Sequence, residues 1–134
     1  MTLQELGFSN WFKAQAALQN TGGCAMARVT AVDRGSCIVH DGLREVPAEI
    51  SGRVSFGIDS PEELPCVGDW ALVHHYNNDT AAIIDGLLPR RTLLRRKAPG
   101  AGRGHQMIAA NIDLALIMQS CHFDFNPSRL ERYL

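Results

Sequence analysis

The strongest chemical feature of this 134-residue sequence is a basic stretch between residues 90 and 105. It contains six Lys and Arg residues and no acidic residue, whereas residues 1–89 contain five basic and 11 acidic residues. The planar guanidinium group can donate two parallel hydrogen bonds to the oxygens of a phosphate. Cationic side chains also release counterions from a nucleic-acid backbone, which makes binding strong at low salt. The stretch therefore predicts an RNA-binding site formed by Arg90, Arg91, Arg95, Arg96, Lys97 and Arg103. The alternative is a solvated linker whose charges pair with the acidic remainder of the chain.

Glycines at positions 100, 102 and 104 would let backbone N–H groups approach a phosphate. They do not form a nucleotide-binding motif, because no Lys-Ser or Lys-Thr pair follows them, as the P-loop requires. A dinucleotide fingerprint is also excluded, since we expect no helix to open after this stretch. No cofactor-binding residue is therefore assigned in this chain.

Catalytic and metal-binding patterns are not evident either. The four cysteines have no CxxC spacing, so we expect reduced thiols and neither a zinc ribbon nor a redox pair. His74 and His75 are neighbours on an expected strand and would point to opposite faces, where they cannot easily share a metal ion. No nucleophile stands beside a recognisable base. We therefore assign no catalytic and no metal-binding residue.

The elements that would position the basic stretch are mainly β. Residues 1–23 predict a short helical segment, with Ser9 as a helix cap and a capping box at Thr2 and Glu5. Residues 24–89 predict five short strands, at 25–32, 37–40, 43–50, 67–74 and 81–84, with a type I′ turn at Asp41-Gly42. Five short strands joined by hairpins favour a closed OB-fold barrel, with Trp70 more simply a core residue than a base-stacking platform.

The composition changes after Pro89. Residues 90–106 predict a mobile, basic, Gly-rich loop, and 107–134 predict the start of a truncated α/β domain. In that last segment, 108–120 are interpreted as a buried strand of a parallel sheet, and Asn126 as the cap of a helix. The N-terminus has no signal-peptide pattern, and the longest apolar run, at 114–118, is too short to span a bilayer. We expect a soluble, cytoplasmic protein without a membrane partner.

Four sequence blocks occur in an order that resembles a known family. They are Val67-Gly68-Asp69-Trp70, then residues 88–97 (LPRRTLLRRK), then 108–113 (IAANID), and finally 124–134 (DFNPSRLERYL). Together they resemble the N-terminal part of the ribosome small-subunit-dependent GTPase A family, RsgA (also called YjeQ). The resemblance covers roughly residues 25–134.

The resemblance implies a function for the full-length protein. Such proteins combine an OB-fold, a circularly permuted GTPase domain and a zinc knuckle, so GTP, Mg²⁺ and Zn²⁺ are implied as cofactors of the whole protein. They hydrolyse GTP to GDP and phosphate on the small ribosomal subunit and assist its late maturation. The implied partners are 16S-type rRNA and the missing GTPase domain in cis, in a protein that acts as a monomer.

Within this chain, the resemblance implies an rRNA-binding domain that is inactive alone, because no GTPase motif and no zinc cluster lies within its 134 residues. Two alternatives remain open. One is a regulatory barrel that relays ribosome binding to the GTPase domain through protein contacts. The other is a free-standing OB module that binds single-stranded nucleic acid.

Overall fold

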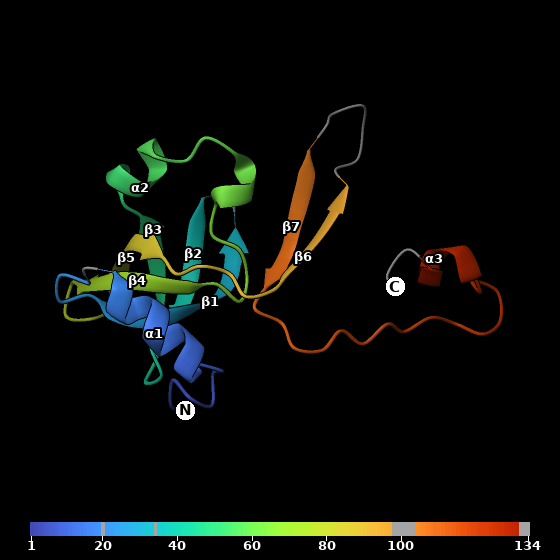
Figure 1. Ribbon diagram of the computed structural model, residues 1–134, viewed down its shortest axis with the longest axis horizontal. Coiled ribbons are helices and arrows are strands. Elements are labelled where there is room, and N and C mark those ends of the chain that lie inside the picture. The colour runs from blue at the N-terminus through green and yellow to red at the C-terminus, as the bar shows by residue number, and fades with distance from the viewer. Residues whose placement is uncertain (20, 34, 98–103, 132–134) are drawn as a thin grey trace.

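A closed barrel of five strands forms the body of the protein (Figure 1). The computed structural model describes residues 1–19, 21–33, 35–97 and 104–131. The strands are β1 (Ala25–Asp33), β2 (Ser36–His40), β3 (Glu45–Ile50), β4 (Trp70–Tyr76) and β5 (Ala81–Leu87). They close in the order β1-β2-β3-β5-β4, with β3 and β5 parallel and every other pair antiparallel. The predicted mainly β fold with an OB-type barrel is confirmed.

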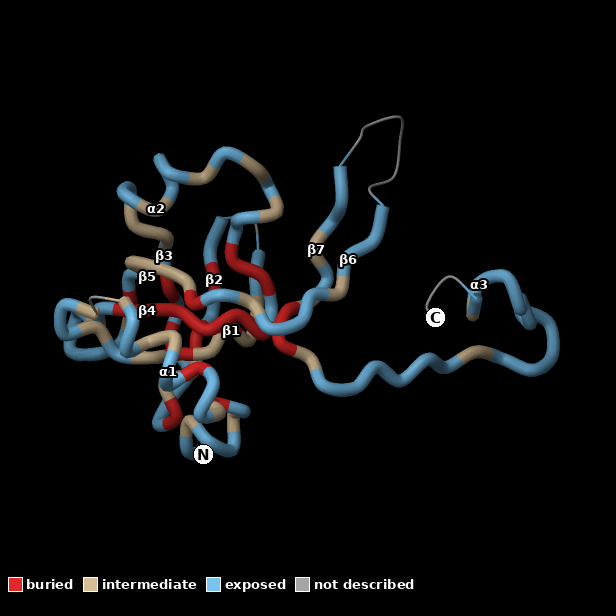
Figure 2. The backbone as a smooth tube through the Cα atoms, viewed as in Figure 1, coloured by how far each residue is buried: buried red, intermediate tan, exposed pale blue. Residues whose placement is uncertain are grey.

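Small and β-branched side chains fill the barrel. Alternate residues of β2 and β3 point inward, as the period of two in a strand requires. The buried cluster consists of Ala27, Val29, Cys37, Val39, Val46, Ala48, Ala71, Val73, Ala82 and Ile84. These short side chains suit the narrow interior of a five-stranded barrel, and Figure 2 shows the buried residues concentrated there.

A second apolar cluster lies outside the barrel, where helix α1 (Asn10–Leu18) packs on β4. Phe8 and Phe12 contact the Trp70 ring, with centroid distances of 4.7 and 5.9 Å. Trp70 is fully buried, so it is a core residue and offers no base-stacking surface. Phe8 and Phe12 cover Trp70 on the outer face of β4, so burial does not alternate at the start of that strand.

One local prediction needs correction, and two short helices were not predicted. The β2–β3 turn is not type I′, because Gly42 has a positive φ of 93° but Asp41 does not. Asp41 instead accepts hydrogen bonds from the backbone N–H groups of Leu43 and Arg44, as turn aspartates commonly do. Between β3 and β4 lie helix α2 (Gly52–Phe56) and the 3₁₀ helix η1 (Pro61–Glu63), which begin at the serine caps Ser51 and Ser60.

The basic stretch is not simply a loop. Strands β6 (Leu93–Lys97) and β7 (His105–Ala110) pair antiparallel and form a two-stranded sheet separate from the barrel. The prediction of a loop over 90–106 is therefore wrong for these strands. Backbone pairing between Arg95 and Met107, and between Lys97 and His105, satisfies hydrogen bonds that a loop would leave to water.

The segment after β7 also differs from its prediction. The strand ends at Ala110, and residues 114–119 form no strand, although a buried strand was expected over 108–120. Most of these side chains are exposed, with Leu116 at 84% and Met118 at 94% (Figure 2). A buried strand needs paired neighbours on both sides, and no described residue provides them here. Helix α3 (Pro127–Glu131) follows, and Asn126 caps it as predicted.

None of the helices that the structure describes combines the length and the apolar composition needed to cross a membrane.

Candidate nucleic-acid interface

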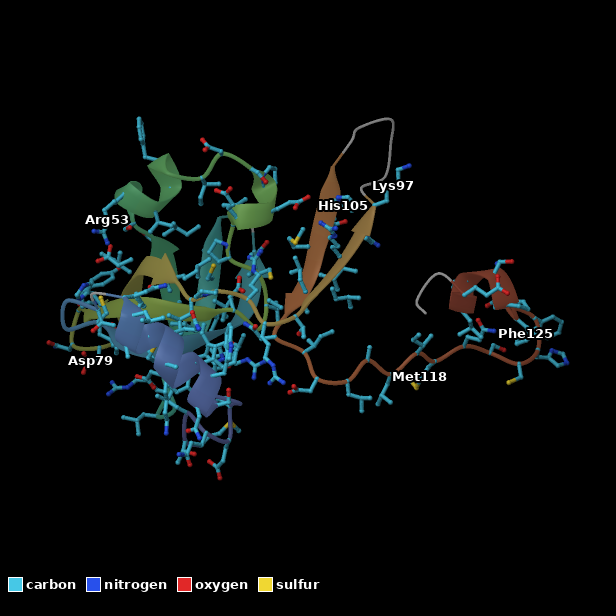
Figure 3. The ribbon with its side chains drawn as sticks, in the orientation of Figure 1. Arg53, Asp79, Lys97, His105, Met118 and Phe125 are labelled. Carbon is cyan, nitrogen blue, oxygen red and sulfur yellow. The ribbon has the colours of Figure 1, made fainter. Side chains whose placement is uncertain are left out.

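The β6–β7 hairpin projects from the barrel and carries cations along its length. We define the basic arm as this hairpin together with the preceding Arg91. Figure 3 shows Lys97 and His105 at the outer end of the described strands, away from the barrel. The exposed cations of the arm are Arg91, Arg95, Arg96 and Lys97. Arg103 lies outside the described residues, so its predicted role stays a prediction.

The contacts of Arg95 and Arg96 leave these two cations accessible. Arg95 lies 3.6 Å from a carboxylate oxygen of Glu62, and both side chains are at least 39% exposed. Arg96 donates from Nε to Gln106 at 2.9 Å on the exposed surface. An exposed ion pair contributes at most about 1 kcal/mol, so Arg95 can leave Glu62 at little cost. The Arg95–Glu62 contact can therefore be exchanged for a phosphate.

The structure gives Arg90 a different environment from its neighbours. Its Nε and Nη2 atoms donate to the two carboxylate oxygens of Asp69, both at 2.8 Å, and Asp69 is completely buried. The same guanidinium donates to the carbonyl oxygens of Glu62 and Leu64. The hydrogen bonds to Asp69 raise the pKa of Arg90 above its usual value. Arg90 thus joins the arm to the barrel, and a phosphate would have to displace these contacts to reach it.

Asp69 also organises the loop that precedes β4. Its Oδ2 accepts from the backbone N–H of Cys66 at 2.8 Å. Burial, together with the nearby Asp69 charge, raises the pKa of the Cys66 thiol to about 11. That thiol is therefore almost entirely protonated at neutral pH and would be slow to react with alkylating reagents.

Asn111 holds the other end of the arm against the barrel. Its side chain accepts from the backbone N–H of Arg91 at 2.8 Å and donates to the carbonyl oxygen of Gly68 at 3.0 Å. Its own N–H donates to Thr92, and the neighbouring Ala110 N–H donates to Val67, each at 2.8 Å. Asn111 adopts a φ of 54°, a conformation that asparagine tolerates better than most residues. Both strands of the arm are thus fixed at their base.

Gly68 is required at this junction. It has a φ of 93°, and a Cβ at this position would overlap the carbonyl oxygen of Ala110. Replacing Gly68 with Ala should lower the free energy of unfolding by roughly 2–4 kcal/mol, because it adds backbone strain and pushes β7 away. Urea denaturation would measure the loss. Gly52→Ala is the matched control, since a Cβ there meets nothing within 4 Å, and its loss should stay below about 0.5 kcal/mol. Equal effects of the two substitutions would contradict the requirement.

The cations of the arm are evident in the sequence, but the residues that hold the arm in place are not. Asp69 and Asn111 are the only buried polar residues among those that the structure describes. The available signal was an acidic residue flanked by apolar ones at the start of a strand, in Val67-Gly68-Asp69-Trp70. Such a side chain is buried only with a partner, and Arg90 is that partner.

A closed five-stranded barrel of this topology, with one helix packed outside it, defines an OB-fold domain, here extended by a basic hairpin. Comparison with curated proteins then identifies its family.

The chain is 41% identical over 86 residues, 64% of its length, to the small ribosomal subunit biogenesis GTPase RsgA of Leptospira interrogans. It is 30% identical over its whole length to the RsgA protein of Opitutus terrae, and 33% identical to one from Lactiplantibacillus plantarum. The chain belongs to the RsgA family, as the order of its sequence blocks predicted, and corresponds to an N-terminal fragment of it.

The match covers a minor part of each relative. The chain spans 24% of the Leptospira protein, 39% of the Opitutus protein and 38% of the Lactiplantibacillus protein. No family model matches the sequence.

Proposed function

We propose that this chain is the RNA-docking domain of a ribosome biogenesis GTPase, and that its basic arm binds phosphates of 16S-type rRNA on the small subunit. The observation that carries the proposal is the arm itself, which presents four exposed cations on a paired hairpin with a fixed base. The names of the relatives, which refer to the small ribosomal subunit, support this partner.

The composition of the arm favours binding to the nucleic-acid backbone over recognition of bases. Residues 90–110 contain no Phe, Tyr or Trp, so the arm has no aromatic platform for unstacked bases. Phosphate contacts position a protein on a nucleic acid but carry little sequence information. The arm would therefore supply affinity and orientation, and the shape of the folded rRNA would supply selectivity.

Hydrolysis of GTP belongs to the whole protein in this proposal. The P-loop pattern G-x-x-x-x-G-K-[ST] does not occur in the 134 residues, so we assign none of them to GTP, Mg²⁺ or the zinc knuckle of the family. The exposed apolar side chains of 114–125 would be covered by the GTPase domain in cis. The full-length protein would act as a monomer in the cytoplasm, where it meets its subunit.

Binding to purified subunits tests the partner. The 134-residue chain should bind small ribosomal subunits at least about 10-fold more tightly than large subunits at moderate salt, because the fold of the rRNA and not charge alone selects the site. Filter binding or sedimentation with labelled protein measures both affinities. Equal affinity for the two subunits would contradict specific docking and leave only non-specific attraction to polyanions.

A further inference from the structure

Three potential metal ligands meet on the outer face of the barrel, at a site that the basic arm does not use. The Sγ of Cys24 lies 3.0 Å from Nε2 of His74, and the same nitrogen lies 3.2 Å from Oδ2 of Asp85. All three donor atoms lie within 4.8 Å of one another. Arg53, which contacts Asp85, is on α2, on the far side of the barrel from Lys97 (Figure 3).

The strand register brings these residues together from distant parts of the sequence. Ala25 of β1 pairs with Val73 of β4, which in turn pairs with Ile84 of β5. Val73 and Ile84 are fully buried in the barrel. Because successive strand residues alternate in direction, His74 and Asp85 point outward, and Cys24 lies beside them just before β1 begins.

The geometry does not suit a nucleophilic relay. In such a relay the histidine uses one ring nitrogen for the nucleophile and the other for the carboxylate. Here the thiol and the carboxylate both approach Nε2. A ring nitrogen carries either one hydrogen or one lone pair, so it cannot make a good hydrogen bond to both groups. Three electron-pair donors therefore converge on one point, which is the arrangement that a bound cation satisfies.

We propose that Cys24, His74 and Asp85 form a Zn²⁺ site. Thiolate, imidazole and carboxylate are the ligands that Zn²⁺ takes in proteins, and bond lengths of about 2.0–2.3 Å place tetrahedral ligands roughly 3–4 Å apart. The two observed separations lie in that range. Binding deprotonates the thiol and releases its proton to solvent, and a water molecule completes the fourth position. The ion joins the start of β1 to β4 and β5, independently of the function proposed above.

Arg53 lies beside this site and opposes a cation there. Its guanidinium lies 3.9 Å from Oδ1 of Asp85, and it donates to the Asp85 carbonyl oxygen at 3.2 Å. Its side chain is 79% exposed, so removing it should not disturb the core. The Arg53→Gln substitution should therefore raise the affinity for Zn²⁺ about two- to five-fold at low salt, because it removes a like charge.

Cobalt substitution tests the site directly. The 134-residue chain carrying Cys121→Ser, which removes an exposed thiol next to His122, is titrated with Co²⁺ and then with Zn²⁺. We expect one equivalent of Co²⁺ to produce a thiolate-to-metal charge-transfer band that Zn²⁺ abolishes. Adding Cys24→Ser should remove the band and weaken Zn²⁺ binding by at least about 100-fold. His74→Gln should weaken it similarly, and Arg53→Gln should strengthen it. Zn²⁺ should also raise the Tm of the parent and not that of the Cys24→Ser variant.

Two results would overturn the proposal. One is a charge-transfer band that persists after Cys24→Ser in a chain whose circular dichroism is unchanged. The other is the absence of stoichiometric Co²⁺ or Zn²⁺ binding by the folded parent. If Cys24→Ser prevents folding, the His74→Gln variant tests the proposal, and unchanged Zn²⁺ affinity in that variant would overturn it. His74 is an exposed residue, so its replacement should leave the barrel intact.

Discussion

Glutamine at all four exposed arm cations is expected to abolish most of the salt dependence of binding to small ribosomal subunits. Each phosphate contact contributes about 0.7–0.9 to the slope of log K against log salt, so four contacts give a slope near −3. The affinity of the wild-type chain should then fall roughly 50- to 150-fold between 50 and 200 mM salt. The variant should bind about 100-fold more weakly at 50 mM salt and show little further loss. The substituted residues are Arg91, Arg95, Arg96 and Lys97.

A matched control separates the location of the charges from their number. A second variant carries four glutamines at basic residues outside the arm, namely Lys13, Arg44, Arg53 and Arg129. Its net charge equals that of the arm variant, but its slope should remain close to that of the wild type. If both variants lose the same affinity, the attraction is a property of the whole protein and the arm has no special role. If the arm variant binds small subunits normally yet alters GTP turnover in the full-length protein, the regulatory interpretation replaces RNA docking.

Arg90→Ala is expected to destabilise the fold more than any other substitution of a basic-stretch residue. It leaves the fully buried Asp69 carboxylate without its partner, which should lower the free energy of unfolding by about 3–5 kcal/mol. Arg96→Ala should change it by less than about 0.5 kcal/mol, because that side chain is exposed. Urea denaturation measures both values. Equal losses in the two variants would show that the Asp69–Arg90 pair does not hold the arm.

Two further measurements sharpen this test. The loss of unfolding free energy in the Asp69→Ala and Arg90→Ala double variant should be about 2 kcal/mol smaller than the sum of the losses in the single variants, since neither charge is then left unpaired.

Cys66 serves as a local reporter, because its thiol is buried and its pKa is raised to about 11. Alkylation of Cys66 should be slow in the wild type and accelerate in Arg90→Ala, while the exposed Cys121 reacts rapidly in both.

The barrel could be predicted from the sequence because its local signals agree with its final packing. β2 and β3 alternate buried and exposed residues, and their connection contains Asp41-Gly42. β4 lacks alternation for a reason that only the structure shows, since α1 covers its outer face at Trp70. The sequence predicts this strand over 67–74, whereas the structure has it at Trp70–Tyr76, and the sequence does not explain its burial pattern.

The sequence favours a loop for the arm because residues 90–105 are basic and Gly-rich. The strands of the arm mix charged side chains with apolar ones such as Leu94 and Met107, so the alternation that identifies a half-buried strand is weak. For the second strand, the sequence instead favours a buried strand beginning at Ile108, because residues 108–118 are apolar except for Asn111 and Asp113. Pairing with β6 ends that strand at Ala110, and the rest of the run finds no neighbour among the described residues.

The roles of Arg90 and Arg91 could not be separated from the sequence alone. Adjacent residues of an extended chain point in opposite directions, so one guanidinium reaches the buried Asp69 while the other faces solvent. The partner of Arg90 lies 21 positions earlier in the sequence, and β4 and β5 lie between the two residues along the chain. The Cys24, His74 and Asp85 cluster was missed for a similar reason, since strand register and not sequence spacing brings it together.

Photo-cross-linking tests most directly the claim that the basic arm lies on rRNA. A diazirine-bearing side chain is placed at position 97 in the arm or at position 79, which Figure 3 shows on the opposite side of the barrel. Each chain is bound to purified small subunits and irradiated, and the products are separated under denaturing conditions before and after ribonuclease treatment. We predict that position 97 cross-links to 16S-type rRNA and that position 79 does not. Cross-links from position 97 to ribosomal protein alone, or equal RNA cross-linking from both positions, would contradict the proposed interface.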